Sequence, residues 1–321
     1  MTMFDRLKGN NFIVIGRAGL DLYVDPPGTE IEDATTFSAA LGGSAANIAV
    51  AIAKQGGKAA LLTAVSSDAV GRYTLNALKS YGLDTRFIKS VGGEARNSLA
   101  VVETRATNCQ SVIYRNDAAD FHVTCADALA IDYSVFAAVI VTGTCLAREP
   151  SRSAVIKAMH LAREAGLVLI IDIDYRPYSW ASRDEARQVC LKAAGMCDVI
   201  VANDEEFAVL AGSENGLELA EHLGLQTGRV VIYKMGDKGC ITFANGDRFD
   251  TPIFAVKALK PTGAGDGFMG GFISGLVAGS SLPDAVRWGA ATAAIVVTRV
   301  GCAPAMPDAA EVQSFMRQAI G

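Results

Sequence analysis

The sequence has no run of basic residues and no apolar stretch long enough to cross a membrane. Its formal net charge at pH 7 is -5, so an electrostatic surface for nucleic acid or anionic lipid is not expected. The first ten residues also lack the apolar core of a signal peptide. These absences predict a cytoplasmic protein that binds neither nucleic acid nor membranes.

Cysteine pairs with metal-ligand spacing are missing too. The seven cysteines are scattered through apolar segments, as is usual for small core residues, at positions 109, 125, 145, 190, 197, 240 and 302. We therefore expect free thiols in a reducing compartment rather than a thiolate metal site.

A dinucleotide-binding fingerprint is also absent. Residues 11–16 form a short apolar run that ends in glycine, as a buried parallel strand does, but residues 16–21 do not supply Gly-x-Gly-x-x-Gly. A dinucleotide-dependent dehydrogenase is therefore not expected. With 321 residues, half of them hydrophobic, the chain suits one large α/β domain, with or without an appendage.

Apolar runs typical of strands alternate with helical patterns along most of the chain. The further runs are 58–65, 84–90, 136–142, 167–172, 198–202 and 229–233, and the helical stretches are 45–54, 68–81, 151–165, 183–194, 265–278 and 282–299. This alternation predicts a doubly wound, mostly parallel sheet with helices on both faces. Two hairpins are expected as well, at 97–115 and at 240–252.

Residues 262–266, Thr-Gly-Ala-Gly-Asp, point to phosphate chemistry. Small residues at 263–265 let successive backbone N–H groups converge in front of a helix, which favours an anion-binding loop. Asp266 would lie in the first helical turn, where a carboxylate suits the general base for an alcohol that attacks a γ-phosphoryl group. The alternative is an ordinary glycine-rich helix start with Asp266 as its cap.

A second group of candidates lies near the N-terminus. Asp21 follows the first strand at the sheet edge where ligands of α/β proteins bind, although a loop aspartate satisfied by its own turn is the alternative. Gly42 and Gly43 allow a close backbone approach to a ligand, and Ser44 is a good N-cap for the following helix. Asn47 would lie in its first turn, facing the ligand or serving only the helix start.

The segments 262–266 and 42–47 resemble the two signatures of the ribokinase-like, or phosphofructokinase B type, carbohydrate kinases. The resemblance implies an ATP-dependent sugar kinase that uses Mg²⁺. It implies a kinase domain of residues 1–16, 40–94 and 125–321, with a small β-sheet lid of residues 17–39 and 95–124. Such a lid covers the substrate with one face and needs cover on the other, so a homodimer through the lid is expected.

The same resemblance assigns roles to single residues. Asp266 would be the base, and the N–H groups of Gly263, Ala264 and Gly265 would stabilise developing charge. The substrate would be held by Asp21, Gly42, Gly43 and Asn47, and the nucleotide by Asn203, Lys234, Gly236, Gly239 and Thr262. Glu206 would act on Mg²⁺ through water, although an ordinary acidic first turn also explains residues 203–206.

Two arginines are candidates for binding the phosphoryl acceptor. Residues 172–180 resemble the Asp-x-Asn-x-Arg-x-x-x-Trp element of family members that phosphorylate sugar acids, with Asp174 in place of the asparagine. Arg176 in this element and Arg115 near the lid are the expected partners of a substrate carboxylate. The resemblance leans toward kinases of 5-dehydro-2-deoxygluconate in inositol catabolism. A 2-dehydro-3-deoxygluconate kinase, a ribokinase or fructokinase, and a catalytically inactive sugar-binding module are the alternatives.

One position departs from the family pattern. Lys260 stands where many family members have an aspartate close to a bound monovalent cation. A lysine ammonium in that place would substitute for the ion, so activation by K⁺ is not expected.

Overall fold

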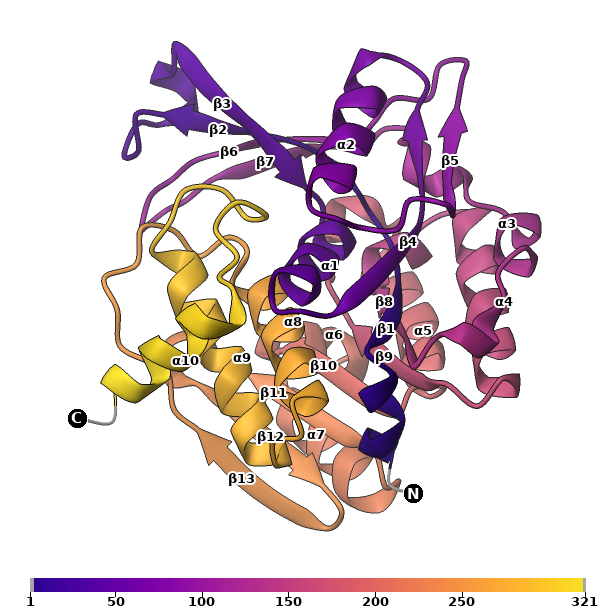
Figure 1. Ribbon diagram of the computed structural model, residues 1–321, viewed down its shortest axis with the longest axis vertical. Helices are drawn as coiled ribbons and strands as arrows, with labels where there is room; N and C mark the ends of the chain where they lie inside the picture. Colours follow the sequence, from indigo (N-terminus) through magenta and orange to yellow (C-terminus); the bar gives the residue numbers. More distant parts are fainter. Residues whose placement is uncertain (1–2, 320–321) are drawn as a thin grey trace.

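The computed structural model describes residues 3–319 and is built on a nine-stranded sheet (Figure 1). The strand order is β13-β12-β11-β10-β9-β8-β1-β4-β5. Neighbours from β11 to β5 are parallel, and β12 and β13 add an antiparallel edge at the predicted hairpin. The strands are β1 Asn11–Ile15, β4 Lys58–Ser66, β5 Ile88–Val91, β8 Ala138–Thr142, β9 Val168–Asp172, β10 Val199–Asn203, β11 Val230–Lys234, β12 Cys240–Ala244 and β13 Asp247–Thr251.

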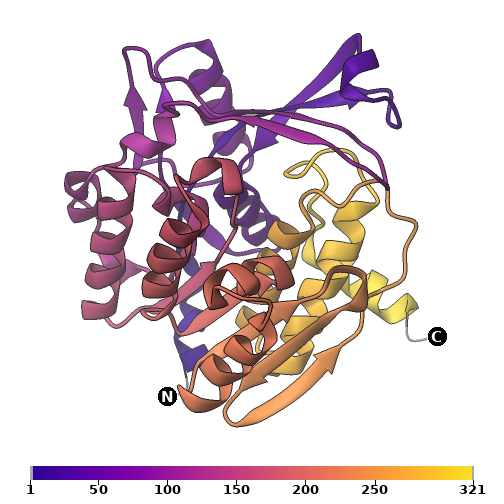
Figure 2. The same cartoon turned by 180° about the vertical axis from the view of Figure 1, so that it is seen from behind.

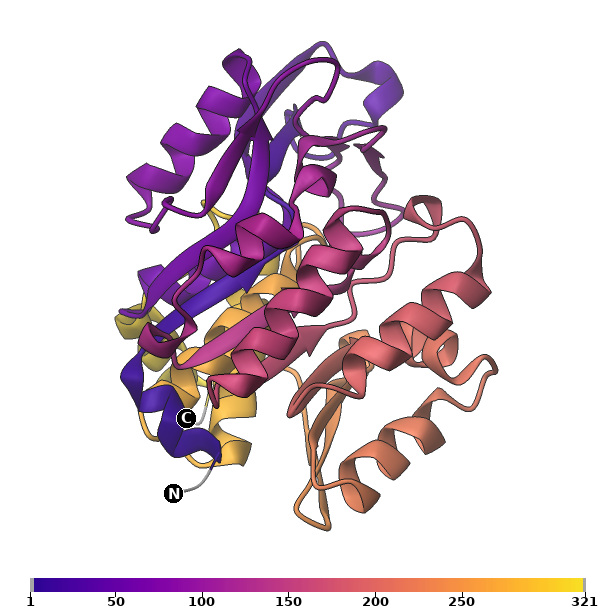
Figure 3. The same cartoon turned by 90° about the vertical axis from the view of Figure 1, so that its right-hand side faces the viewer.

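Helices cover both faces of this sheet, as the edge view in Figure 3 shows. Strand β1 explains why, because alternate side chains point to opposite faces: Phe12 and Val14 join one core, and Ile13 and Ile15 join the other. The first face carries α1 Ser44–Lys54, α2 Ala69–Ser80, α8 Ala264–Val277 and α9 Leu282–Val297, with α10 Ala309–Gln318 packed on α9. The second carries α3 Cys125–Leu129, α4 Ser151–Glu164, α5 Arg183–Ala194, α6 Asp204–Ala211 and α7 Gly216–Gln226. The predicted doubly wound α/β fold is confirmed.

A separate four-stranded sheet projects from the main body, with the order β3-β2-β6-β7 (Figure 2). Its strands are β2 Gly19–Asp25, β3 Thr36–Gly42, β6 Leu99–Val102 and β7 Ser111–Tyr114. Strands β6 and β7 form the hairpin predicted for residues 97–115, and β2 and most of β3 lie in the segment 17–39 that the resemblance assigned to the small sheet without locating its strands. Strand β3 runs to Gly42, beyond the expected limit at residue 39, and leads directly into α1. The small sheet is therefore tied to the helix that begins beside the site.

The carboxyl ends of the central parallel strands meet at one edge of the main sheet, beneath the small sheet. Arg17 and Asp21 follow β1, residues 142–144 end β8, residues 172–176 follow β9, and Asn203 ends β10. In open α/β sheets this edge is where ligands bind. None of the described helices combines the length and apolar character needed to cross a bilayer.

Candidate active site

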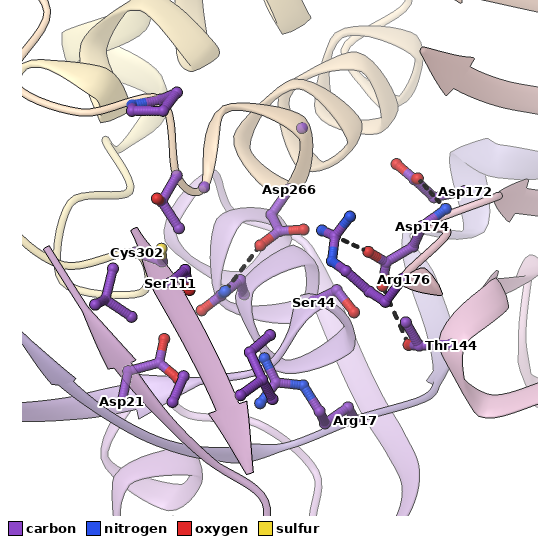
Figure 4. A pocket seen from close by; sticks show the side chains of 18 of the residues that line it. Arg17, Asp21, Ser44, Ser111, Thr144, Asp172, Asp174, Arg176, Asp266 and Cys302 are labelled. Carbon is purple, nitrogen blue, oxygen red and sulfur yellow. Dashed lines mark hydrogen bonds and ion pairs between the residues drawn. The ribbon is translucent and has the colours of Figure 1, made fainter. Parts of the chain in front are cut away.

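A pocket of about 390 Å³ lies between this sheet edge and the small sheet (Figure 4). We call it the polar pocket, because charged side chains from the strand ends and from α8 line it. The small sheet closes it with Ala100, Val102, Ser111 and Ile113. Residues from all parts of the chain therefore meet in one cavity.

A second pocket of about 390 Å³ lies next to the first. We call it the apolar pocket, since Ile253, Phe254, Phe268, Ala294 and Val297 contribute to its wall. The two pockets share three lining residues: Lys234, Pro261 and Gly265. Their junction is thus at the glycine-rich loop.

The loop at 261–266 turns into α8 at the junction of the two pockets. Gly263 is the N-cap of α8 and has a left-handed φ of 86°, which favours glycine. A Cβ atom there would lie 2.8 Å from Cys302 Sγ, so the close packing of this turn also requires glycine. The N-terminus of α8 lies at the junction, where the helix dipole favours an anion, and the Ala264 N–H there donates to the Pro261 carbonyl at 3.3 Å.

Asp266 lies in the first turn of α8 and is joined to Asn47 in the first turn of α1. Asn47 Nδ2 donates a hydrogen bond of 2.8 Å to Asp266 Oδ2, across 219 residues of sequence (Figure 4). Burial and, to a smaller extent, the nearby Asp174 carboxylate raise the pKa of Asp266 to about 7, whereas the Asn47 hydrogen bond acts to lower it. The structure therefore brings the two sequence motifs together around a carboxyl group poised to exchange a proton near neutral pH.

Asp21 lies on β2, at the far side of the polar pocket from Arg176 in Figure 4. Its Oδ2 accepts a hydrogen bond of 3.0 Å from the Tyr23 hydroxyl, whereas Oδ1 has no partner among the described residues. Asn47 Oδ1 and Ser44 Oγ are buried without partners in the same way. Buried polar atoms of this kind are usually satisfied by water or by a ligand.

The two glycines before α1 serve these neighbours rather than only a ligand. A Cβ atom on Gly42 would lie 1.9 Å from Asp21 Oδ1, and one on Gly43 would lie 2.4 Å from the Arg17 carbonyl oxygen. Gly43, with a φ of 100°, is also the N-cap of α1. The prediction that Ser44 caps this helix was therefore wrong: Ser44 is its first residue, and its hydroxyl lines the pocket instead.

The residues expected to organise Mg²⁺ and phosphate stand at the start of α6. Asn203 is its N-cap and forms a reciprocal capping box with Glu206. Glu206 accepts from the backbone N–H of Asn203 at 2.8 Å and from that of Tyr175 at 3.0 Å. Burial, reinforced by the Asp172 carboxylate, raises the pKa of Glu206 to about 7. Each Glu206 oxygen accepts one of these backbone hydrogen bonds.

The remaining nucleotide candidates surround the junction. Lys234 Nζ lies 3.4 Å from Asp172 Oδ2 and lines both pockets. Gly236 and Gly239 line the apolar pocket, and both have left-handed φ angles, of 59° and 85°. Thr262 lines the polar pocket, where Cys109 of the small-sheet hairpin comes within 4.0 Å of its hydroxyl.

Both arginines predicted from sequence reach the polar pocket, and each already has an acidic partner. Arg176 Nη2 lies 2.8 Å from Asp174 Oδ1. Arg115 forms a buried ion pair with Asp120 and donates a hydrogen bond of 2.9 Å to the Thr144 carbonyl.

Three further features differ from expectation or were not foreseen. Lys260 is fully buried, and its ammonium donates to the Thr262 carbonyl. Cys302 lines the polar pocket and accepts a hydrogen bond of 3.1 Å from the Tyr23 hydroxyl, a contact that was not foreseen. Arg17 and Ser44 also line this pocket and were missed as site residues. Arg17 could have been found by the signal used for Asp21, a polar residue close to the end of a buried strand. Ser44 could have been found by the signal used for Asn47, a polar residue at the start of a helix.

A family model described as pfkB family carbohydrate kinase matches residues 10–309 of this chain. The chain is 38% identical over 301 residues to a 5-dehydro-2-deoxygluconokinase of Photobacterium profundum, which covers 92% of this chain and 91% of the relative. It is 34% identical over 322 residues to the 5-dehydro-2-deoxygluconokinase of Geobacillus kaustophilus, and this match covers 98% of this chain and 96% of the relative.

Solved structures show the same likeness. A fructokinase of Vibrio cholerae with fructose, ADP and calcium ion bound superimposes with a TM-score of 0.83 at 25% identity, covering 96% of this chain and 99% of the other. A double mutant of that fructokinase, with fructose, ADP and potassium ion bound, gives a TM-score of 0.83 at 26% identity, covering 95% and 97%. The fold thus has counterparts among solved fructokinases.

Proposed function

The chain belongs to the pfkB family of carbohydrate kinases, and from that premise we propose that it transfers the γ-phosphoryl group of ATP to a primary hydroxyl of the sugar acid 5-dehydro-2-deoxygluconate. The names of its relatives and the cationic side chains of the polar pocket support this acceptor. The sugar acid would occupy the polar pocket, and the nucleotide base would occupy the apolar pocket.

The contact between Asn47 and Asp266 carries the proposal. It places a carboxyl group with a pKa of about 7 where the two pockets meet. Asp266 would take the proton of the attacking hydroxyl as its oxygen bonds to the γ-phosphorus and the bond to the β-phosphate oxygen breaks. The N–H groups of Gly263, Ala264 and Gly265 would stabilise charge on the transferred group, because they form the start of α8.

The other site residues are proposed to hold the two substrates. Asp21, Ser44 and Asn47 present unpartnered polar atoms that would bind sugar hydroxyls, and Gly42 and Gly43 let these groups approach one another. For the nucleotide, the proposed residues lie at the junction or in the apolar pocket: Asn203, Lys234, Gly236, Gly239 and Thr262.

Hydrated Mg²⁺ fits the donors that are present. Burial raises the pKa of Asp172, Glu206 and Asp266, so a nearby divalent cation would favour their charged forms. No group of three acidic, histidine or cysteine side chains among the described residues would hold a bare metal ion. That suits Mg²⁺, which keeps several waters and binds through one or two carboxylates and the phosphates of its substrate. When bound, Mg²⁺ would neutralise phosphate charge during transfer.

The small sheet is proposed to act as the lid. Val102 and Ile113 face the polar pocket, so they would exclude water from the reacting hydroxyl. Phe37, Val112 and Tyr114 of the same sheet are 43%, 44% and 58% exposed, and a second copy of the chain would cover them in a homodimer. A monomer in analytical ultracentrifugation would contradict this assembly.

An ADP-release assay across a panel of acceptors tests the function. The panel contains 5-dehydro-2-deoxygluconate, 2-dehydro-3-deoxygluconate, ribose and fructose, each with Mg²⁺ and ATP. We expect the highest kcat/KM for the first of these and a phosphate monoester as product, identified by ³¹P NMR. A higher kcat/KM for a neutral sugar would overturn the proposed acceptor while leaving the kinase family unchanged.

A further inference from the structure

The cationic side chains of the polar pocket differ in whether they already have an acidic partner. Arg176 is paired with Asp174, Arg115 with Asp120, and Lys234 with Asp172. Arg17 is the exception, since it has no ion pair with any described residue. Its one side-chain hydrogen bond runs from Nη1 to Ser98 Oγ at 3.2 Å. The remaining N–H groups of its guanidinium are therefore available to a ligand.

Arg17 is nevertheless held firmly in place. Its carbonyl accepts the Ala46 N–H in the first turn of α1 at 3.3 Å, and Gly43 permits that approach. Gly19 allows the side chain to lie close by, because a Cβ atom there would be 3.1 Å from Arg17 Nη1. Only 9% of Arg17 is exposed. A guanidinium that is buried, fixed and unpaired is costly by itself, and a bound anion would remove that cost.

The neighbours of Arg17 and Arg176 separate two ends of the pocket. The charge of Arg176 acts on Asp266 and is influenced by Glu206, so Arg176 belongs to the end where phosphate is transferred. The charge of Arg17 instead acts on Asp21, where it opposes the effect of burial on that carboxyl group. Figure 4 shows the Arg17 side chain on the Asp21 side of the pocket, away from Asp174 and Arg176.

Asp21 does not neutralise Arg17 by direct contact. No ion pair joins the two, and Asp21 Oδ2 is already bound by the Tyr23 hydroxyl. Arg17, Arg115 and Arg176 all line the polar pocket, so their guanidinium groups border one common space. Of the three, Arg17 is the one without an ion pair to a described residue, although its charge interacts with the Asp21 carboxylate.

We propose that Arg17 binds the carboxylate of the substrate and determines the preference for sugar acids over neutral sugars. This rests on the proposed function, and it assigns to Arg17 the role that the sequence suggested for Arg176 or Arg115. A substrate whose attacking hydroxyl lies at Asp266 would place its other end at Asp21 and Arg17. The planar guanidinium would bind the two carboxylate oxygens with two parallel N–H groups.

The test is a cycle that removes one charge from the enzyme and one from the substrate. The proteins are wild type, Arg17→Gln, Arg17→Lys and Arg176→Gln, and the substrates are 5-dehydro-2-deoxygluconate and its C1 carboxamide. Arg72→Gln, on the exposed side of α2 outside the pocket, is the matched control. Circular dichroism melts and ATP titrations show whether each variant is folded.

We expect Arg17→Gln to lower kcat/KM for the carboxylate roughly ten- to hundredfold, the usual effect of losing a hydrogen-bonded charge. The carboxamide should lose much less, and Arg17→Lys should recover part of the loss, because it keeps the charge without the planar fork. Arg176→Gln should lower kcat/KM for both substrates alike. Arg72→Gln should behave as the wild type.

Two failures are distinguishable. If the wild type itself shows no preference for carboxylate over carboxamide, the proposed sugar-acid function is wrong. If the wild type prefers the carboxylate and Arg17→Gln keeps that preference in full, Arg17 is not the carboxylate partner. Should Arg17→Gln not fold, the same comparison made with Arg17→Lys decides, since an unchanged preference there contradicts bidentate binding.

Discussion

The two pockets that meet at Gly265 are built in opposite ways. The polar pocket collects side chains from the segment after β1, β2, the start of α1, the hairpin, β9, α6 and α8, and several of its buried polar atoms have no partner among the described residues. Apart from Ala106, the apolar pocket uses only residues 234–297, mostly alanine and other apolar side chains on α9 and the segment after β13. The first is assembled by the fold as a whole, and the second is nearly local. We therefore expect the polar pocket to discriminate strictly between ligands and the apolar pocket to accept a wider range of them.

The largest effect is expected at the junction of the two pockets, where a substitution should abolish phosphoryl transfer while both substrates still bind. Asp266→Asn keeps the size of the side chain and its contact with Asn47 but removes the base. We expect kcat to fall by ~10²- to 10⁴-fold with ATP affinity retained. Single-turnover kinetics and an ATP titration measure the two quantities, and Asp250→Asn, at an exposed position on β13, is the matched control.

The same assignment predicts how kcat of the wild type changes with pH. A general base acts only when deprotonated, so kcat should fall as the pH drops through the raised pKa of Asp266, about 7. The residual activity of Asp266→Asn should lack this acidic limb. A near-wild-type rate, or the same limb in the variant, would remove Asp266 from the role of base.

A smaller effect is expected in the apolar pocket. Ala294 on α9 is 7% exposed and lines this pocket, so Ala294→Leu would occupy space proposed for the nucleotide base. We expect KM for ATP to rise about tenfold, as overpacking costs ~1–3 kcal/mol. KM for the sugar acid at saturating ATP should not change. Ala310→Leu, at an exposed position on α10, is the control, and an equal rise in both KM values would show that the two pockets are not separable.

The contrast between the pockets also explains which parts of the site the sequence could reveal. Periodicity sufficed for the parallel sheet and for helices such as α5, predicted at residues 183–194 and found there. Asp21 was identified because it follows a short buried strand, and Asn47 because it belongs to the motif of residues 42–47. The ion pair of Arg176 with Asp174 was not foreseen, because it depends on the local backbone, in which Asp174 has a left-handed φ of 39° that no sequence pattern showed.

Some elements could not be located from their own sequence pattern. Strand β2 pairs with β3 and with the hairpin strand β6. Strand β3 has mostly exposed side chains, so it lacks a buried face that a pattern would show, and only the resemblance assigned this segment to a sheet. Helix α7 begins at a glycine, which masks its start. Arg17 was overlooked because an arginine after a strand usually faces solvent, and its burial depends on Gly19, Gly43 and Ser98 being brought together by the fold.

The smallest expected effect concerns the loop that divides the two pockets. A related fructokinase has been solved with potassium ion bound, whereas this chain places Lys260 beneath the loop. Lys260 is fully buried, and its ammonium donates to the Thr262 carbonyl. A positive charge of the chain itself therefore already binds the backbone next to the proposed anion-binding N–H groups. A free cation at the same place would be repelled by that charge.

Exchanging Na⁺ for K⁺ at constant ionic strength should therefore change kcat less than about twofold, well below the tenfold that 1.4 kcal/mol would produce. The assay uses the sugar acid and MgATP at saturation, with choline chloride as a third salt to remove both ions. Equal rates in all three salts would agree with an internal cation. A steep, saturable rise of kcat with K⁺ alone would show that the loop binds an ion despite Lys260. Catalysis at the junction would then depend on a cation from the solvent as well as on Lys260.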